Sequence, residues 1–305
     1  MIFTSFDKKQ IFVYDWTDVP APRGVVQIAH GMEEHAGRYE TFARELNALG
    51  YAVVADDHRG HGDTDPETLG YAAGDMFADT VEDMAGIAQH FRQKFAGLPY
   101  VLFGFSYGSF LTQAFIERHA GLLDGAVIAG SSKQKGGMVR MGGMVAALGC
   151  AFKGESAPAK LIDRLVFGGY DKKFADGEFL STDKENNERY YADPYCGFKC
   201  SYNFYRSFFK GLKGLYTKEN AAGLDRALPL LLIAGAEDAV GGREGVGRLY
   251  DFYKKQGIKR VELELIEGSR HEFLNERENH DRAVSRIAEF LASCPARGEG
   301  EQQGE

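Results

Sequence analysis

Short apolar runs that alternate with amphipathic segments constrain the fold of this 305-residue chain more than any other feature. The expected strands are Val25–His30, Ala52–Asp56, Tyr100–Phe105, Gly125–Ala129, Leu228–Gly235 and Val261–Leu265. Between residues 79 and 95, apolar side chains recur every three or four positions, which predicts a helix with one buried face. This alternation predicts an α/β fold, with a mostly parallel sheet and helices on both of its faces.

The alternation stops between residues 131 and 226, where no clear run of buried strands occurs. From 167 to 216, 14 of 50 residues are Phe or Tyr, against 12% aromatic residues in the whole chain. We interpret 131–226 as a helical cap inserted into a core made of 1–130 and 227–294. The aromatic residues either build the small core of this cap or line an apolar pocket for an acyl chain, and the sequence leaves both interpretations open.

Charge and composition exclude several classes of protein. The net charge of −8 argues against nucleic-acid binding, because phosphate contacts need clustered Lys and Arg. The start of the chain lacks the apolar region of a secretory signal, and no apolar run is long enough to predict a membrane span. The cysteines, which we expect to be reduced, are Cys150, Cys196, Cys200 and Cys294. We therefore expect a cytoplasmic protein, with a disordered polar tail at 295–305.

A serine between two glycines follows the third expected strand, in GFSYG at 104–108. The pattern G-x-S-x-G arises by chance in many chains, so its context has to decide its meaning. Here it ends a strand and precedes a helix-like segment, Tyr107–His119, which is the context of a nucleophile elbow. The sequence therefore predicts Ser106 as the nucleophile of an acyl-transfer site.

The other groups that such a site needs have candidates later and earlier in the chain. His271, in the loop after the last expected strand, is the predicted base. Asp238, after the preceding strand, is the predicted orienting acid, with its neighbour Glu237 as the alternative. The predicted oxyanion donors are the backbone N–H groups of Tyr107 and of Met32, in the His-Gly loop after the first expected strand.

Five motifs occur in order along nearly the whole chain: HGMEEHAGRY (30–39), DHRGHGDTD (57–65), GFSYG (104–108), GAEDAVGG (235–242) and GSRHEFLNE (268–276). Together they resemble the monoglyceride lipase and lysophospholipase branch of the α/β-hydrolases, which is close to the serine aminopeptidases. The resemblance implies an α/β-hydrolase fold with about eight strands and a cap. It also implies that Ser106, Asp238 and His271 form the triad and that Met32 and Tyr107 supply the oxyanion amides.

Two residues depart from the pattern of that branch, and neither departure removes a catalytic group. Phe105 replaces the usual histidine before the nucleophile, and Thr64 replaces the usual serine after the RGHG turn. Because Phe105 flanks the nucleophile, we expect it and the aromatic insertion to influence the choice of substrate.

Several charged residues near these motifs need no catalytic role. The histidines and aspartates of 57–65 could suggest a metal site, but the glycines among them favour a turn over a rigid ligand array. Glu33, Glu34 and His35 are expected to hold the oxyanion loop in place. We therefore expect neither a metal nor an organic cofactor.

The expected function is hydrolysis of carboxylic esters through an acyl-enzyme, with monoacylglycerol or lysophospholipid as the substrate class that the resemblance implies. The partner is then a small-molecule ester or lipid, with transient contact of the cap with a membrane surface. A short-chain carboxylesterase, a thioesterase, a peptidase or an acyltransferase would use the same residues. A non-catalytic binding protein on the same scaffold is the alternative from another class.

Overall fold

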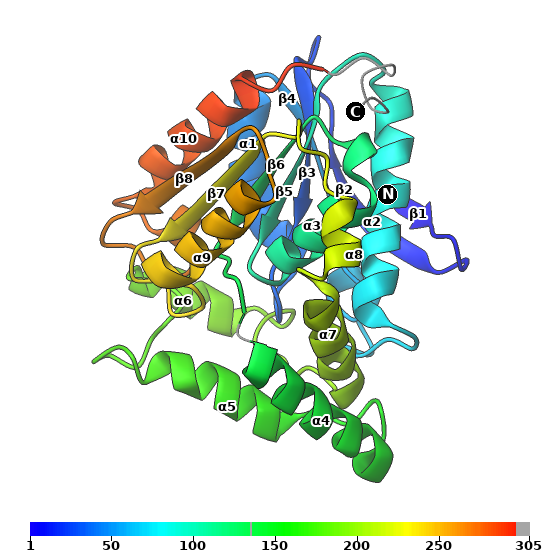
Figure 1. Cartoon of the computed structure of the whole chain (residues 1–305), viewed down its shortest axis with the longest axis vertical. Coiled ribbons are helices and arrows are strands. Elements are labelled where there is room, and N and C mark those ends of the chain that lie inside the picture. Colours follow the sequence, from blue (N-terminus) through cyan, green and yellow to red (C-terminus); the bar gives the residue numbers. More distant parts are fainter. Residues whose placement is uncertain (135, 297–305) are drawn as a thin grey trace.

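The structure is a computed structural model that describes residues 1–134 and 136–296 (Figure 1). Of the predicted tail at 295–305, all but the first two residues lie outside the described part. The strands are β1 (Ile2–Thr4), β2 (Gln10–Trp16), β3 (Gly24–Ala29), β4 (Tyr51–Asp56), β5 (Tyr100–Phe105), β6 (Gly125–Ala129), β7 (Leu230–Gly235) and β8 (Val261–Ile266). They form one sheet in the order β1-β2-β4-β3-β5-β6-β7-β8. From β4 to β8 all neighbours pair in parallel, which confirms the predicted sheet.

The strands β1 and β2 were not among the expected strands. Both pairings of β2 are antiparallel, with β1 on one side and with β4 on the other. Burial alternates along β2, where Ile11 and Val13 are fully buried between more exposed neighbours. This alternation of burial is typical of a strand with one wet face. The available sequence signal was the run of β-branched and aromatic residues IFVY at 11–14.

Helices cover both faces of the sheet, as predicted (Figure 1). On one face, α1 (Glu40–Ala48) and α10 (His280–Ala292) pack on the sheet through residues such as Phe42, Leu46, Ile287 and Phe290. On the other face lie α2 (Met76–Lys94), α3 (Tyr107–Arg118) and α9 (Gly242–Lys255). The helix expected at 79–95 is the main part of α2. Short 3₁₀ turns occur at Ala36–Tyr39, Gly62–Thr64, Ala120–Leu122 and Phe273–Asn275.

Five helices lie between β6 and β7 in the sequence: α4 (Gly136–Lys153), α5 (Lys160–Asp171), α6 (Lys184–Ala192), α7 (Tyr202–Gly214) and α8 (Lys218–Ala222). Figure 1 shows α4, α5 and α6 beyond one end of the sheet. Two glycines of α4 permit its close packing on α7, because a Cβ at Gly142 or Gly149 would overlap the ring of Phe209 or Tyr202. The helical content of the insertion therefore agrees with the prediction, while the division into core and cap stays a prediction.

No helix in the described ranges combines the length and the apolar character needed to cross a membrane.

Candidate active site

Ser106 lies on a sharp turn between β5 and α3. Its backbone has φ 51° and ψ −113°, a conformation that costs a non-glycine residue about 1–3 kcal/mol. The Ser106 N–H donates to the carbonyl of Ala129 at 3.0 Å, which ties the turn to the end of β6. The side chain is partly exposed, so that the strained turn presents its hydroxyl at the end of the strand.

The glycines on either side of Ser106 are required by close approach. A Cβ on Gly104 would overlap the Thr112 hydroxyl and the carbonyl of Gly108. A Cβ on Gly108 would overlap the carbonyl oxygens of Ala29 and His30, at the end of β3. The G-x-S-x-G pattern therefore follows from the packing of α3 against β3 and β5.

The structure brings His271 and Asp238 to Ser106 in one line of hydrogen bonds. His271 Nε2 lies 2.9 Å from Ser106 Oγ, and its Nδ1 lies 2.9 Å from Asp238 Oδ1. Asp238 also accepts a hydrogen bond of 2.8 Å from the Val240 amide. The alternative acid, Glu237, is exposed, whereas Asp238 and His271 are buried.

The charges around His271 favour its protonated form. Burial by itself lowers the pKa of the imidazole, but the charge and hydrogen bond of Asp238 act against it, together with the charges of Glu272 and Glu34. The net effect is a pKa above the ordinary histidine value. An imidazole in this environment can accept a proton from a hydroxyl and hold it as an imidazolium ion.

The loop after β3 is held by side chains on both sides of the Gly31 peptide. His30 Nε2 accepts a hydrogen bond from the His58 amide at 3.0 Å, so we assign the ring proton to Nδ1, which donates to the Gly31 carbonyl at 2.7 Å. Because the C=O and N–H of a trans peptide point in opposite directions, the Met32 N–H is directed away from His30. The Gly31 N–H is in turn held by Glu34 Oε1 at 2.6 Å.

The three residues expected to hold this loop have different roles. Only Glu34 bonds directly to the Gly31 amide. The Glu33 backbone, at φ 59°, turns the chain, and its carbonyl accepts hydrogen bonds of 2.9 Å from Tyr190 and from the Gly197 amide. His35 binds Asp193 in the segment after α6 at 3.0 Å. The loop is therefore tied both to itself and to the insertion.

A buried ion pair that was not predicted from sequence connects the loop after β3 to the loop after β8, which contains His271. Arg38 donates to both carboxylate oxygens of Glu272, at 2.8 and 2.9 Å, and to Glu34 at 2.5 Å. Asn186 of α6 donates to Glu272 at 2.6 Å. Arg38 and Glu272 both lie inside motifs of the chain, but 234 residues separate them, and no local pattern pairs two such distant charges.

Comparison with known proteins places this chain in a family. The model of the family described as "Serine aminopeptidase, S33" matches residues 20–278. The chain belongs to the serine aminopeptidase S33 family. It is 31% identical over 272 residues to a monoacylglycerol lipase of Mycolicibacterium smegmatis, covering 87% of this chain and 88% of that protein. It is 26% identical to the monoglyceride lipase of Homo sapiens, covering 87% and 80% of the two chains.

A solved structure described as a lipase in its open form has the same fold as this S33-family chain. The two share 28% sequence identity and a TM-score of 0.88, over 97% of this chain and 98% of the other. These findings confirm the α/β-hydrolase fold and the resemblance to monoglyceride lipases. The chain is thus a member of a monoacylglycerol lipase-like hydrolase family, with lipases and esterases among its structural neighbours.

The structure explains the two departures of this S33-family member from the pattern of the monoglyceride lipase branch. Phe105 is buried, and its ring centroid lies 4.8 Å from that of His271. It therefore packs against the imidazole rather than lining an open pocket. Thr64 keeps the function of a serine hydroxyl, because its Oγ1 donates to the Asp57 carbonyl at 2.6 Å and accepts from the Phe12 amide at 2.9 Å.

Most polar side chains of 57–65 bond within the fold, although the buried Nε2 atoms of His58 and His61 have no hydrogen-bond partner among the described residues. Asp57 accepts from the amides of Ala36 and Asp63, each at 2.8 Å. His58 Nδ1 lies 2.7 Å from Asp56, and the His58 ring stacks on His30 with centroids 3.9 Å apart. These contacts favour the structural interpretation of the segment over a metal site.

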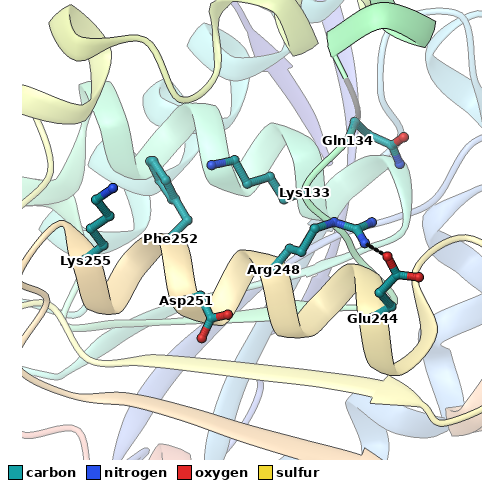
Figure 2. A pocket seen from close by; sticks show the side chains of 7 residues that line it. All are labelled: Lys133, Gln134, Glu244, Arg248, Asp251, Phe252 and Lys255. Carbon is teal, nitrogen blue, oxygen red and sulfur yellow. Dashed lines mark hydrogen bonds and ion pairs between the residues drawn. The ribbon is translucent and has the colours of Figure 1, made fainter.

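A surface hollow elsewhere on this S33-family chain contains none of the predicted site residues (Figure 2). It lies between residues 133–134 and α9. The Lys133 ammonium lies 4.3 Å from the centre of the Phe252 ring, and Arg248 pairs with Glu244 at 2.5 Å. Cations and acids alternate along this hollow, so its charge favours no single class of ligand.

Proposed function

We propose that this chain is a serine hydrolase that cleaves carboxylic esters of monoacylglycerol or lysophospholipid through an acyl-enzyme. The observation that supports this best is the line of hydrogen bonds from Ser106 through His271 to Asp238, on a strained turn at the end of a parallel strand. Such a line supplies a nucleophile, its base and the group that orients the base.

In the proposed reaction, His271 Nε2 takes the Ser106 proton while Oγ attacks the ester carbonyl. The Asp238 carboxylate holds the ring in the correct tautomer and stabilises the imidazolium. The N–H groups of Met32 and Tyr107 donate to the oxyanion. Tyr107 is the first residue of α3, so its N–H has no partner within the helix. His271 then protonates the leaving alcohol, and water attacks the acyl-enzyme with His271 again as base.

We propose that residues 131–226 form a cap that provides an apolar wall beside this site. Phe179 lies 5.9 Å from the His271 ring, measured between centroids, and Phe167 and Tyr170 pack against Phe179. A backbone contact fixes this wall to the loop that contains His271, because the Leu180 carbonyl accepts a hydrogen bond from the Glu272 amide at 2.6 Å. An aromatic wall next to the nucleophile suits an acyl chain.

We also propose that the exposed apolar side chains of α4 contact a lipid surface. Large apolar side chains that are 58–84% exposed recur every three or four residues along α4: Met138, Met141, Met144, Leu148 and Phe152. Leu161 and Leu165 extend the exposed apolar surface onto α5. A helix with such a stripe can lie in the boundary between headgroups and acyl chains, which would bring the site to its substrate.

The proposed substrate class is tested by hydrolysis rates across p-nitrophenyl esters of increasing chain length, with a monoacylglycerol and a lysophospholipid measured alongside. We expect the rate constant kcat/KM to rise from acetate towards longer acyl chains and the monoacylglycerol to be cleaved. A sharp optimum at acetate, with no cleavage of either lipid, would support a short-chain carboxylesterase instead. Because the family is described as a serine aminopeptidase, an aminoacyl p-nitroanilide belongs in the same series. Its preferential cleavage would identify a peptidase.

A further inference from the structure

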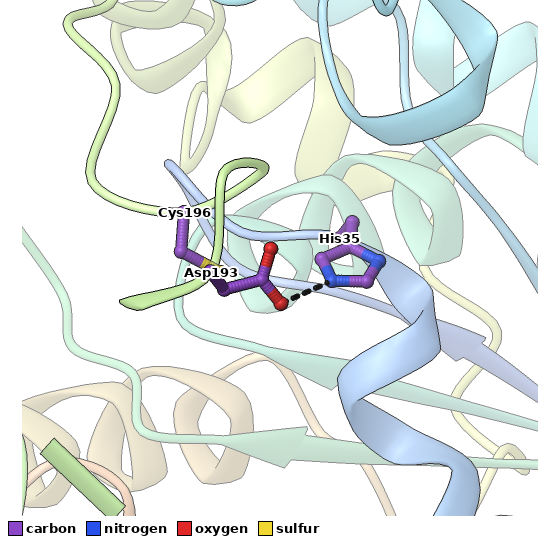
Figure 3. Close-up of side chains that lie close together, drawn as sticks. All are labelled: His35, Asp193 and Cys196. Carbon is purple, nitrogen blue, oxygen red and sulfur yellow. Dashed lines mark hydrogen bonds and ion pairs between the residues drawn. The ribbon is translucent and has the colours of Figure 1, made fainter. Parts of the chain in front are cut away.

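Three side chains that the proposed reaction does not use meet where the loop after β3 contacts the insertion (Figure 3). His35 lies at the end of that loop, and Asp193 and Cys196 lie in the segment that follows α6. His35 Nε2 is 3.0 Å from Asp193 Oδ2. One possible ligand atom from each of the three side chains lies within 4.8 Å of the other two.

We propose that His35, Asp193 and Cys196 form a binding site for a Zn²⁺ ion, with a water molecule as the fourth ligand. An imidazole, a carboxylate and a thiolate are the three types of side chain that zinc binds in proteins. Ligand atoms on a tetrahedral zinc ion lie roughly 3.3–3.8 Å apart, since the bonds are about 2.0–2.3 Å long. Side-chain movements of about 1 Å therefore complete the site.

A cation that enters from solvent would meet His35 and Asp193 first, because the Cys196 thiol is buried against an apolar cluster. His35 and Asp193 are 12% and 29% exposed, so that an ion can reach them. Asp193 is oriented by the Tyr195 amide, which donates to its Oδ1 at 2.8 Å and leaves Oδ2 directed at His35. The positive charge of nearby Arg38 is offset by its bonds to Glu34 and Glu272.

Such an ion would connect two segments that are distant in sequence. The segment with Asp193 and Cys196 already bonds to the oxyanion loop, because the Gly197 amide donates to the Glu33 carbonyl at 2.9 Å. On binding, the Cys196 thiol releases its proton to solvent and its sulfur forms the bond to the metal. The ion would then add a link between the loop after β3 and the cap, independently of the chemistry at Ser106.

Cobalt titration of the metal-free full-length protein tests the site, because Co²⁺ bound to a thiolate has a characteristic charge-transfer absorption. We expect one Co²⁺ per chain with this absorption, its displacement by Zn²⁺, and a melting temperature that rises with zinc concentration. Cys196→Ser should lose the charge-transfer band, and His35→Gln and Asp193→Asn should each weaken binding by at least about tenfold. Cys150→Ser, which changes a thiol on α4, is the matched control and should keep the band.

A wild-type protein that binds no stoichiometric Co²⁺ or Zn²⁺ would overturn the proposal. So would a charge-transfer band that persists in Cys196→Ser, since the sulfur ligand would then be another residue. The circular dichroism spectrum of each variant distinguishes a lost ligand from a lost fold. If Cys196→Ser does not fold, weaker metal binding by His35→Gln tests the site instead, because the His35 imidazole is a separate ligand. None of these measurements depends on ester hydrolysis.

Discussion

His271 is the residue whose protonation sets the pH dependence of the proposed reaction. It acts as a base only when neutral, so kcat/KM should fall as the pH drops below its pKa. Since the neighbouring carboxylates raise that pKa, we expect the acid limb above the ordinary histidine value of about 6.5. The sequence alone predicts a limb near 6.5, because the position of Glu272 and Glu34 around His271 is a property of the fold.

The contribution of Glu272 to this limb can be measured with Glu272→Gln. Removing one negative charge should shift the acid limb to lower pH, because the charge of Glu272 helps to raise the pKa of His271. Glu278→Gln changes an exposed carboxylate in the same segment and should leave the limb unchanged. A purely structural role for Glu272 would lower activity without moving the limb, and an unmoved limb would contradict the electrostatic account.

Ser106, Asp238 and His271 were all predicted from sequence, because each follows a strand of a parallel sheet, and the carboxyl ends of parallel strands lie on the same side of the sheet. The geometry that joins them stays a proposal for catalysis. The role of Phe105 could not be predicted in the same way. Its contact with His271 arises between β5 and a loop 166 positions later in the chain, and no periodicity indicates such a contact.

At the scale of elements, the turn between β5 and α3 depends on the absence of a side chain at Gly108. Gly108 lies in the first turn of α3, where helix propensity alone would favour alanine. We expect Gly108→Ala to destabilise the protein by more than about 1 kcal/mol, because its Cβ meets the carbonyls of Ala29 and His30. Gly247→Ala in α9 is the control: nothing lies within 4 Å of its Cβ, so it should stabilise the protein by about 0.5–1 kcal/mol. Equal effects in urea unfolding would contradict this explanation.

The loops that follow β3 and β8 depend on the positive charge of Arg38. Arg38→Met leaves the buried carboxylates of Glu34 and Glu272 without their cation, which should cost about 3–5 kcal/mol of unfolding free energy. Arg44→Met removes an exposed ion pair of α1 and should cost no more than about 1 kcal/mol. Urea unfolding at neutral pH compares the two variants. Similar losses of unfolding free energy would show that the buried pair stabilises the protein no more than the exposed one.

This ion pair also predicts how stability depends on acid. Burial opposes ionisation of Glu272, but Arg38, Asn186 and Asn275 lower its pKa from 4.5 to about 2. A carboxylate with a lowered pKa stabilises the folded state above its unfolded pKa, and this contribution is lost as the pH falls from about 4.5 towards 2. The difference in stability between wild type and Arg38→Met should therefore narrow over that range.

At the scale of the whole molecule, the apolar stripe on α4 predicts binding to phospholipid vesicles. The double variant Leu148→Ser and Phe152→Ser should bind at least about tenfold more weakly, because each large apolar side chain contributes about 1.5–3 kcal/mol when fully buried. Phe6→Ser removes a similarly exposed ring from the turn between β1 and β2 and should have no effect. Cosedimentation with vesicles measures all three proteins, and equal binding would exclude α4 as the contact.

The architecture as a whole was largely predictable, because buried parallel strands and amphipathic helices each have a strong local pattern. The arrangement of the insertion was not, since its helices are fixed by contacts such as that of Gly142 in α4 with Phe209 in α7. The edge strand β1 has only three residues and its neighbour β2 is buried on one face only, so that neither resembles the fully buried strands of the sheet centre. The cytoplasmic location stays a prediction from sequence.

The most direct test of the proposed chemistry is the mass of the protein after reaction with a fluorophosphonate, followed by mapping of the modified peptide. We predict a single adduct on Ser106 in the wild type, no adduct in Ser106→Ala, and a fall in ester hydrolysis of roughly 10⁴-fold or more in that variant. A folded wild-type protein that gains no adduct, or a Ser106→Ala protein that hydrolyses esters at the wild-type rate, would contradict the assignment of Ser106 as the nucleophile.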